Sequence, residues 1–402
     1  MKKLTAIFLL VVLLTFGISS LVLADGTETL GPPSIPISSG TGIVAAGTGL
    51  AASQPGTIDV NVPGNVVQVL VYWGGATVGI GVGDNTISLN GTPVTGMLIG
   101  GPAFFFTCPA ACGANQGDFF YSNYRADITG LGLVGSGVNS LTVGGMNFGG
   151  EESGAGLLVI FDDGSDTTDI QVVDGLDLAF AGFPEPRQTT VPQTFTFTAA
   201  SIERTADLVI FAGSVGADGR SNTIKTITNG PNGATTDIFN LLSSADGDLW
   251  DTLTIQVPIP AEATELTVEA ISGGPDNNPA SLNWVGAGLS VPPPPPPGGE
   301  GCTPGYWKNH LDDWLPTGYF PGDDFDATFG VDNFDPDITL EEAVNAKGGG
   351  VKKLARHGTA ALLSAAHSDV NYPYTVAEVI AFVQAGDADS LADANELGCP
   401  IN

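Results

Sequence analysis

The feature that most constrains the fold is a β pattern running from Asp25 to about Val291. In Thr57–Val62 and Thr194–Thr198 polar and apolar residues alternate, as in half-buried strands. Val66–Trp73, interrupted only by Gln68, and Gly156–Phe161 are nearly continuous apolar runs, which are typical of strands buried on both faces. Asn-Gly and Asp-Gly pairs punctuate the pattern as turns. The sequence therefore predicts a mainly β fold of antiparallel, jelly-roll-like β-sandwiches.

The β region also contains a weak internal repeat, with similar segments in the same order in both halves. The matched segments are Val69–Gly75 with Leu208–Ser214, Ser140–Val143 with Glu265–Val268, and Gly154–Leu157 with Gly286–Leu289. We therefore predict two tandem sandwiches, residues 25–183 and 184–291, which separate near Phe183-Pro-Glu-Pro186. The alternative is a chance likeness between segments of ordinary β composition.

A proline and glycine linker, residues 292–300, follows the β region. Its six consecutive prolines, Pro292–Pro297, predict a polyproline II rod of about 19 Å. Beyond it the hydrophobic period changes to that of helices. Thr339–Glu342 and Thr375–Glu378 are capping boxes, and an apolar stripe begins at Val351. Residues 301–402 are therefore predicted to form a small α-helical domain.

The N-terminus, residues 1–24, has the layout of a secretory signal peptide. Lys2 and Lys3 precede the apolar stretch Leu4–Phe16, and Val22-Leu-Ala24 is a suitable cleavage site. An uncleaved membrane anchor is the alternative, because the stretch could nearly span a bilayer. We expect a secreted, cell-surface-associated protein with no membrane span after cleavage.

The chain is strongly acidic, with 12 Lys and Arg against 43 Asp and Glu. Removing Lys2 and Lys3 with the signal peptide changes the formal net charge from −31 to −33. Such a field repels nucleic acid and anionic lipid, which excludes both as partners, and it attracts counterions such as Ca²⁺.

Four cysteines permit three pairings. In an oxidising compartment we expect Cys108–Cys112, which would close a short loop, and Cys302–Cys399, which would close the helical domain. A redox role for the first pair is the alternative. The three residues between these cysteines differ from the two of thioredoxin-like motifs, which favours the structural role.

Two dense groups of aspartates are candidate calcium ligands. They are Asp162, Asp163, Asp166 and Asp169 in the β region, and Asp323, Asp324, Asp326, Asp332, Asp335 and Asp337 in the helical domain. Closely spaced carboxylates repel one another unless a cation neutralises them, and Ca²⁺ prefers hard oxygen ligands. The spacing does not match an EF-hand, and solvated acidic loops are the alternative.

Tyr306, Trp307 and His310 lie together in Gly305-Tyr-Trp-Lys-Asn-His310 and form a candidate glycan platform, because aromatic faces stack on sugar rings. The alternative is that the aromatic rings fill the core of the small domain. No Gly-x-Ser-x-Gly motif occurs, and the β region has no histidine to act as a base. The sequence thus predicts no catalytic residues, no cofactor except calcium, and no enzyme.

Two parts of the chain resemble known exported proteins. The β region resembles an uncharacterised sandwich domain of secreted bacterial and archaeal surface proteins, through Tyr72-Trp-Gly-Gly75, Tyr124-Arg-Ala-Asp127, Gly156–Asp163 and Asp174-Gly175. The segment from Cys302, with Gly305–His310 and Arg356-His357, resembles a C-terminal module of multidomain exported proteins. The resemblance implies export and surface architecture, and it brings no catalytic residues with it.

Together these features predict a non-enzymatic structural or adhesive extracellular protein, such as a matrix, surface-layer or filament component. Its expected partners are cell-surface or matrix components, glycans, or copies of itself. The alternative is a secreted carbohydrate-binding protein or polysaccharide hydrolase that carries the sandwich as an accessory module.

Overall fold

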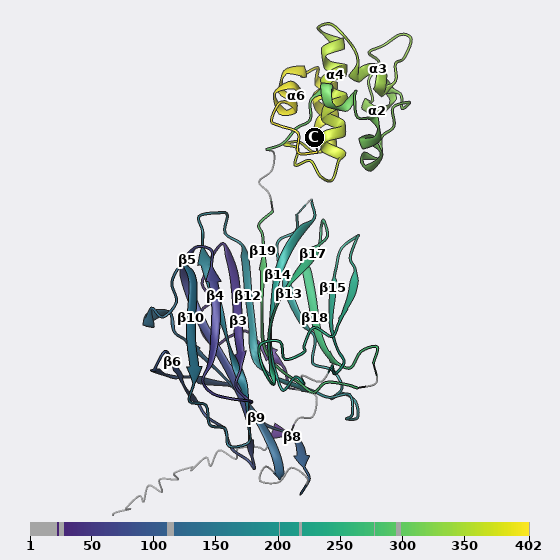
Figure 1. The fold of residues 1–402 in the computed structure, drawn as a ribbon. Coiled ribbons are helices and arrows are strands. Elements are labelled where there is room, and N and C mark those ends of the chain that lie inside the picture. The colour runs from purple at the N-terminus through teal and green to yellow at the C-terminus, as the bar shows by residue number, and fades with distance from the viewer. Residues whose placement is uncertain are drawn as a thin grey trace, which may run out of the picture.

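A computed structural model describes residues 22–23, 28–110, 116–200, 202–216, 219–276, 278–294 and 299–401 (Figure 1). Apart from residues 22–23, the predicted signal peptide lies outside the described residues, as do the last three prolines of the proline run. In the described part of the chain, no helix has both the length and the apolar character needed to cross a membrane.

The strands form four sheets (Figure 1). The strands of the first half are β1 (Val22–Leu23), β3 (Gly42–Gly49), β4 (Gly56–Val62), β5 (Asn65–Val78), β6 (Thr86–Leu89), β7 (Thr92–Thr95), β8 (Met97–Cys108), β9 (Gly117–Asp127), β10 (Gly137–Gly144) and β11 (Glu151–Asp162). They make a six-stranded sheet, β1-β8-β9-β5-β11-β3, and a four-stranded sheet, β4-β10-β6-β7. A 3₁₀ turn, η2 (Thr129–Leu131), follows β9.

The second half repeats this plan. Its strands are β2 (Leu30–Gly31), β12 (Asp169–Ala179), β13 (Gln193–Thr196), β14 (Arg204–Gly213), β15 (Asn222–Thr228), β16 (Thr235–Phe239), β17 (Trp250–Ile259), β18 (Glu265–Ser272) and β19 (Leu282–Val291). They make a five-stranded sheet, β17-β14-β19-β12-β2, and a four-stranded sheet, β13-β18-β15-β16. All pairings in the four sheets are antiparallel except that of β1 with β8.

The two halves have equivalent topology, which confirms the predicted tandem sandwiches. The order β9-β5-β11-β3 in the first large sheet corresponds to β17-β14-β19-β12 in the second, and β4-β10-β6-β7 corresponds to β13-β18-β15-β16. Each sequence match recognised above falls on such a corresponding pair, for example β5 with β14 and β11 with β19. Strand β8 has no counterpart and adds a hairpin with β9.

The change from one sandwich to the other lies earlier than the predicted split near Phe183. Strand β12 ends at Ala179 but pairs with β19, in the large sheet of the second sandwich. The reason is the repeat itself, because β12 takes the position that β3 takes in the first sandwich. Conversely, β2 precedes the first sandwich in sequence and pairs with β12.

Each sandwich has its own apolar core, a third core joins the two, and a fourth, smaller cluster joins β8 and β9 to β12. The third core lies between the two large sheets and contains buried residues of both, including Leu70, Tyr72, Leu158, Phe211 and Trp250. Tyr72 and Phe211 stack across it with ring centroids 5.1 Å apart. The large sheets are therefore covered on both faces, as the nearly continuous apolar runs predicted. We call the two joined sandwiches, residues 28–291, the β body.

Two glycines of β11 allow the large sheets to approach closely. A side-chain carbon on Gly156 would lie 2.6 Å from the Phe211 ring, and one on Gly154 would lie 2.6 Å from the Cβ of Trp250. Contacts that short are sterically excluded, so larger residues at these positions would separate the sheets. The repeated Gly-Ala-Gly pattern of β11 thus has a packing reason in the first sandwich.

The C-terminal domain is helical, as predicted. Its elements are α1 (Pro304–Trp307), η3 (Leu311–Thr317), α2 (Phe325–Phe329), α3 (Leu340–Val344), α4 (Val351–Ala366), α5 (Val376–Ala385) and α6 (Ala388–Asn395). Both predicted capping boxes are present, at Thr339 and Thr375. Helix α3 ends at Val344, before the three glycines Gly348–Gly350. Trp307 and Trp314 are fully buried among the helices.

The disulfide Cys302–Cys399 is present and confirms the predicted closure of the helical domain. It links residues 97 positions apart and brings the two ends of the domain together. Cys108, at the end of β8, is also disulfide-bonded, but Cys112 lies outside the described residues. Its predicted pairing with Cys108 therefore stays a prediction.

Candidate functional site

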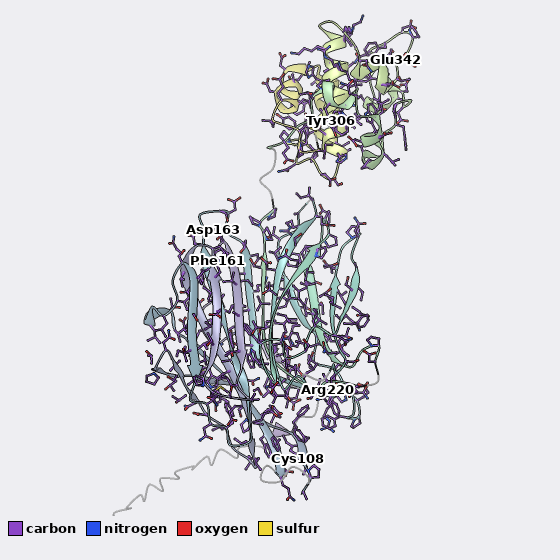
Figure 2. All side chains as sticks on the ribbon, in the orientation of Figure 1. Cys108, Phe161, Asp163, Arg220, Tyr306 and Glu342 are labelled. Atoms are coloured by element: carbon purple, nitrogen blue, oxygen red, sulfur yellow. A yellow bond between two sulfur atoms is a disulfide. The ribbon has the colours of Figure 1, made fainter. Side chains whose placement is uncertain are left out.

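The first group of predicted calcium ligands lies in the loop after β11, at one end of the first sandwich (Figure 2). Asp162 accepts a hydrogen bond from the Gly164 amide (2.9 Å), and Asp163 accepts from the amide and hydroxyl of Ser165 (3.0 and 2.6 Å). The hydrogen bonds from Ser165 hold the pKa of Asp163 below its ordinary value. These carboxylates therefore build the turn, and Asp166 is exposed while Asp169 starts β12.

In the second group the aspartates also serve local structure. Asp324 caps α2 by accepting from the Ala327 amide (2.7 Å), and Asp323 accepts from the Phe320 amide (2.8 Å). Asp326 is buried, and its Oδ2 accepts from the Asn333 and Phe334 amides, both at 2.9 Å.

The remaining three aspartates of this group, Asp332, Asp335 and Asp337, are exposed. The pKa of Asp337 is raised, chiefly by the charge of Asp324 and then by partial desolvation and the other acidic neighbours. Among the residues that the structure describes, no three His, Cys, Asp or Glu side chains converge as a group that could hold a metal ion. Calcium binding stays a prediction.

The candidate glycan platform does not form an open aromatic face. Trp307 is completely buried, and its indole Nε1 donates to Ser364 Oγ (3.1 Å). Tyr306 is nearly buried, and its hydroxyl donates to Asp313 and to the Ile401 carbonyl. His310 is exposed and stacks on Tyr306 at 4.2 Å between ring centroids. The prediction of a platform was therefore wrong for Trp307, which fills the core.

The most elaborate polar site of the β body lies where the two sandwiches meet, and we call it the seam. Three alternate residues of β9, Tyr121, Asn123 and Arg125, share one face of that strand. Each contacts a polar side chain of the second sandwich. Their respective partners are Ser214, Asn283 and Asp174.

The Arg125–Asp174 ion pair is the charged element of the seam. The two side chains are only 2 % and 5 % exposed, so the pair is removed from water. The second guanidinium nitrogen of Arg125 donates to Ser34 Oγ (3.0 Å), and the Tyr72 hydroxyl donates to Asp174 (3.4 Å). Burial raises the pKa of Asp174, and the adjacent guanidinium opposes that rise. An ion pair so enclosed costs desolvation energy to form, but losing one partner costs more.

Asn123 and Asn283 form a reciprocal pair at the centre of the seam. Each amide nitrogen donates to the other side chain's oxygen at 2.9 Å, and Asn123 also donates to the Gly175 carbonyl (2.9 Å). Both side chains are completely buried. Buried amides satisfied in this way fix one relative position of the two large sheets, because any sliding would leave them unpaired.

Tyr121 completes the seam at the end near the β8–β9 hairpin. Its hydroxyl lies 3.1 Å from Ser214 Oγ and donates to Glu151 (2.9 Å). Burial raises the pKa of both Tyr121 and Glu151. The hydroxyl thus couples the start of β11 to the end of β14.

The seam can orient the two large sheets. Its polar groups are enclosed and bond to one another, so they are not available to a substrate. Tyr124-Arg-Ala-Asp127 and Asp174-Gly175 both belong to the motifs that carry the family resemblance, but the sequence does not predict that Arg125 and Asp174 pair. The available signal was the scarcity of basic residues in an acidic β region, because a cation there needs an anionic partner if it is buried.

Comparisons with known proteins give little further information. No family model matches the chain, and no curated protein matches it. An uncharacterised Listeria monocytogenes protein, lmo2446, aligns at 9% identity and a TM-score of 0.19, over 62% of this chain and 22% of its own length. This chain thus spans about a fifth of that protein.

Two further solved structures are also distant. The VP2 subviral particle of infectious bursal disease virus aligns at 13% identity and a TM-score of 0.22, over 65% of this chain and 75% of that one. A CBM22-1-CBM22-2 tandem domain from Paenibacillus barcinonensis aligns at 8% identity and a TM-score of 0.20, over 68% of this chain and 99% of that one. At such scores none of these likenesses bears on function.

Proposed function

We propose that this chain is a non-enzymatic extracellular protein with a structural or adhesive role. The observation that carries the proposal is the junction between the sandwiches. An apolar third core and the polar seam join them into one body, rather than leaving two modules on a flexible connection. A rigid body of this kind suits a protein that transmits force or sets distance at a surface.

Two other observations support the extracellular part of the proposal. The Cys302–Cys399 disulfide suits an oxidising compartment. A formal net charge of −31 favours solubility outside the cell and repels anionic lipid and nucleic acid. The candidate partners are matrix or cell-surface components, glycans, or further copies of the chain.

One pocket favours the rival function of a polysaccharide-binding or polysaccharide-cleaving protein. Its volume is about 480 Å³, and its lining includes Glu151 and Glu152 beside the stacked rings of Phe106 and Phe119. Aromatic faces and paired carboxylates are the elements of a sugar site. Against this rival, Glu151 accepts from Tyr121 and Ser153, and Glu152 accepts from the Phe148 amide (3.1 Å).

The test uses the purified mature chain. Light scattering and electron microscopy measure assembly, and retention on cell-wall and matrix polysaccharides measures adhesion. Release of reducing ends from the same polysaccharides measures turnover. We expect assembly or retention without turnover.

The rival makes the opposite prediction, with turnover that Glu152→Gln abolishes. The matched control is Glu265→Gln, which changes an exposed glutamate of β18. Turnover lost in the first variant and kept in the second would overturn the proposal. So would a monomer that neither assembles nor is retained on any of these materials.

A further inference from the structure

The basic residues of the helical domain are gathered in one place, although the domain as a whole is acidic. Residues 301–402 contain five lysines and arginines. They are Lys308, Lys347, Lys352, Lys353 and Arg356. Four of them come from the connection before α4 and from its first two turns, and the fold brings Lys308 of the α1 region to them.

Three of these residues line a pocket of about 460 Å³. Its basic lining consists of Lys308, Lys347, Arg356 and His357, and the rest includes the backbone of Gly305 and Gly348. Lys352 lies at the rim, because its Cδ is 3.6 Å from where a side-chain carbon on Gly348 would be. Side chains from two separate segments of the chain thus contribute positive charge to one cavity.

Arg356 shapes the wall of this pocket. Its Nη1 donates to the Ala346 carbonyl (2.7 Å) and the Gly348 carbonyl (3.4 Å), which holds the glycine-rich connection against α4. Gly348 and Gly350 have φ values of 121° and 59°, which residues with a side chain rarely adopt. The bend is therefore specific to glycine.

Most of this positive charge is not neutralised within the protein. Of the five, only Lys353 forms an ion pair in the described part of the chain, with Asp389. Lys308, Lys347 and Lys352 are exposed and have no such partner there. In a chain with 43 acidic residues, cations kept together and unpaired leave a local positive potential that favours an anion.

His357 adds a polar group to the same pocket. Its Nδ1 is buried and has no hydrogen-bond partner among the described residues. Burial, followed by the charges of Arg356 and Lys353, lowers the pKa of His357, while Glu396 and Asp389 act in the opposite direction. Burial therefore disfavours the charged imidazolium, so His357 contributes a polar ring to the pocket and not an additional positive charge.

We propose that this pocket binds an oxyanion: a sulfate, a phosphate or the carboxylate of an acidic sugar. Lysines supply charge from two sides, and Arg356 has further N–H groups beyond those bound to the loop. The cavity is large enough for a charged group carried on a sugar ring. The site is independent of the proposed role of the β body.

The test is calorimetric titration of the mature full-length chain at fixed ionic strength. Sodium sulfate, sodium phosphate and glucuronate are the probes, and glucose is the neutral counterpart of glucuronate. We expect saturable binding of at least one anion and none of glucose. Glucuronate binding tighter than sulfate and phosphate would identify a sugar carboxylate as the ligand, and the reverse order would identify a free inorganic anion.

The test variant is Lys308→Gln with Lys347→Gln, which removes two exposed cations from the pocket. We expect its affinity to fall at least tenfold while its thermal midpoint without ligand stays unchanged. The matched control is Lys225→Gln, which changes a lysine of β15 in the β body and should bind as the parent does. Equal binding by the parent and the double variant, or no saturable binding of any anion, would overturn the proposal.

Discussion

The β body and the helical domain differ in what holds each of them together. The β body has four apolar cores and a buried polar seam, made chiefly by contacts between strands distant in sequence. The helical domain has one core, built around Trp307 and Trp314, and a disulfide that joins its ends. A domain of about 100 residues buries less of its surface, so a covalent constraint matters more to it.

The comparison also concerns charge. The β body encloses the Arg125–Asp174 pair between its large sheets, whereas the lysines of the helical domain remain at the surface around a pocket. A buried pair is sensitive to the loss of either partner, while exposed charges contribute little to stability. Stability tests should therefore separate the two regions, and binding tests should concern chiefly the second.

The largest effect is expected on removing the disulfide. Replacing Cys302 and Cys399 by serine opens a loop of 97 residues, which in the loop-entropy model is worth about 4.7 kcal/mol. We expect the midpoint temperature of unfolding of the helical domain, measured by circular dichroism at 222 nm, to fall strongly. The midpoint temperature of the β body should not change. If both fell together, the two regions would unfold as one unit and the comparison would fail.

The next largest effect is expected at the seam. Arg125→Met leaves the carboxylate of Asp174 buried without its cation, which should cost the β body about 3–5 kcal/mol. Denaturant unfolding followed by tryptophan fluorescence measures the change. The double variant with Asp174→Leu removes both charges and should recover much of the loss.

The control for this experiment is Lys225→Met. Lys225 and Glu269 form a more exposed pair at 3.8 Å, and such pairs contribute about 0–1 kcal/mol. If Arg125→Met destabilised the protein no more than Lys225→Met does, the seam would not hold the sandwiches together.

Local patterns in the sequence predicted the elements well. Alternation and apolar runs identified the strands, two capping boxes identified the starts of α3 and α5, and the repeat identified the tandem sandwiches. These signals lie within a few residues of one another or recur along the chain. The pairing of Cys302 with Cys399 was also predictable, because the two cysteines bracket a region of distinct periodicity.

Features that depend on long-range register were not predictable. The position of β12 in the sequence, before the predicted split near Phe183, suggests the first sandwich, and only its pairing with β19 assigns it to the second. Arg125 and Asp174 lie 49 residues apart on strands of different sheets, and no local pattern connects them. The basic pocket likewise depends on the fold, which brings Lys308 to the connection before α4.

A smaller, pH-dependent effect is expected at Asp177. Its carboxyl is buried in β12 and accepts from the Val191 amide (2.8 Å), and burial, with a contribution from Glu28, raises its pKa to about 8. The folded state therefore keeps a proton that the unfolded state releases near pH 4. Because the folded state then binds more protons, stability falls as the pH rises from about 4 to about 8.

Asp177→Asn tests this dependence. An asparagine resembles the protonated acid and can keep the hydrogen bond from Val191. We expect the variant to match the parent near pH 4 and to exceed it by about 1–3 kcal/mol at pH 8.5. Other partly buried acids, including Glu151 and Asp246, also have raised pKa values, so the difference between variant and parent is the quantity to measure. A constant difference at all pH values would contradict the assignment.

The smallest effect is expected from calcium. The acidic stretches around Asp163 and Asp337 place like charges close together, and the raised pKa of Asp337 reflects that repulsion. A cation bound only by the folded form stabilises it in proportion to the logarithm of its concentration, so weak sites act at millimolar Ca²⁺. Yet several of these carboxylates already accept hydrogen bonds from their own loops, so few ligands are free and the gain in stability is limited to about 1 kcal/mol or less.

The measurement compares the thermal midpoints of both regions in EDTA, in millimolar Ca²⁺ and in NaCl of matched ionic strength. A rise with Ca²⁺ beyond that with NaCl supports specific sites, and an equal rise means that ordinary screening accounts for the effect.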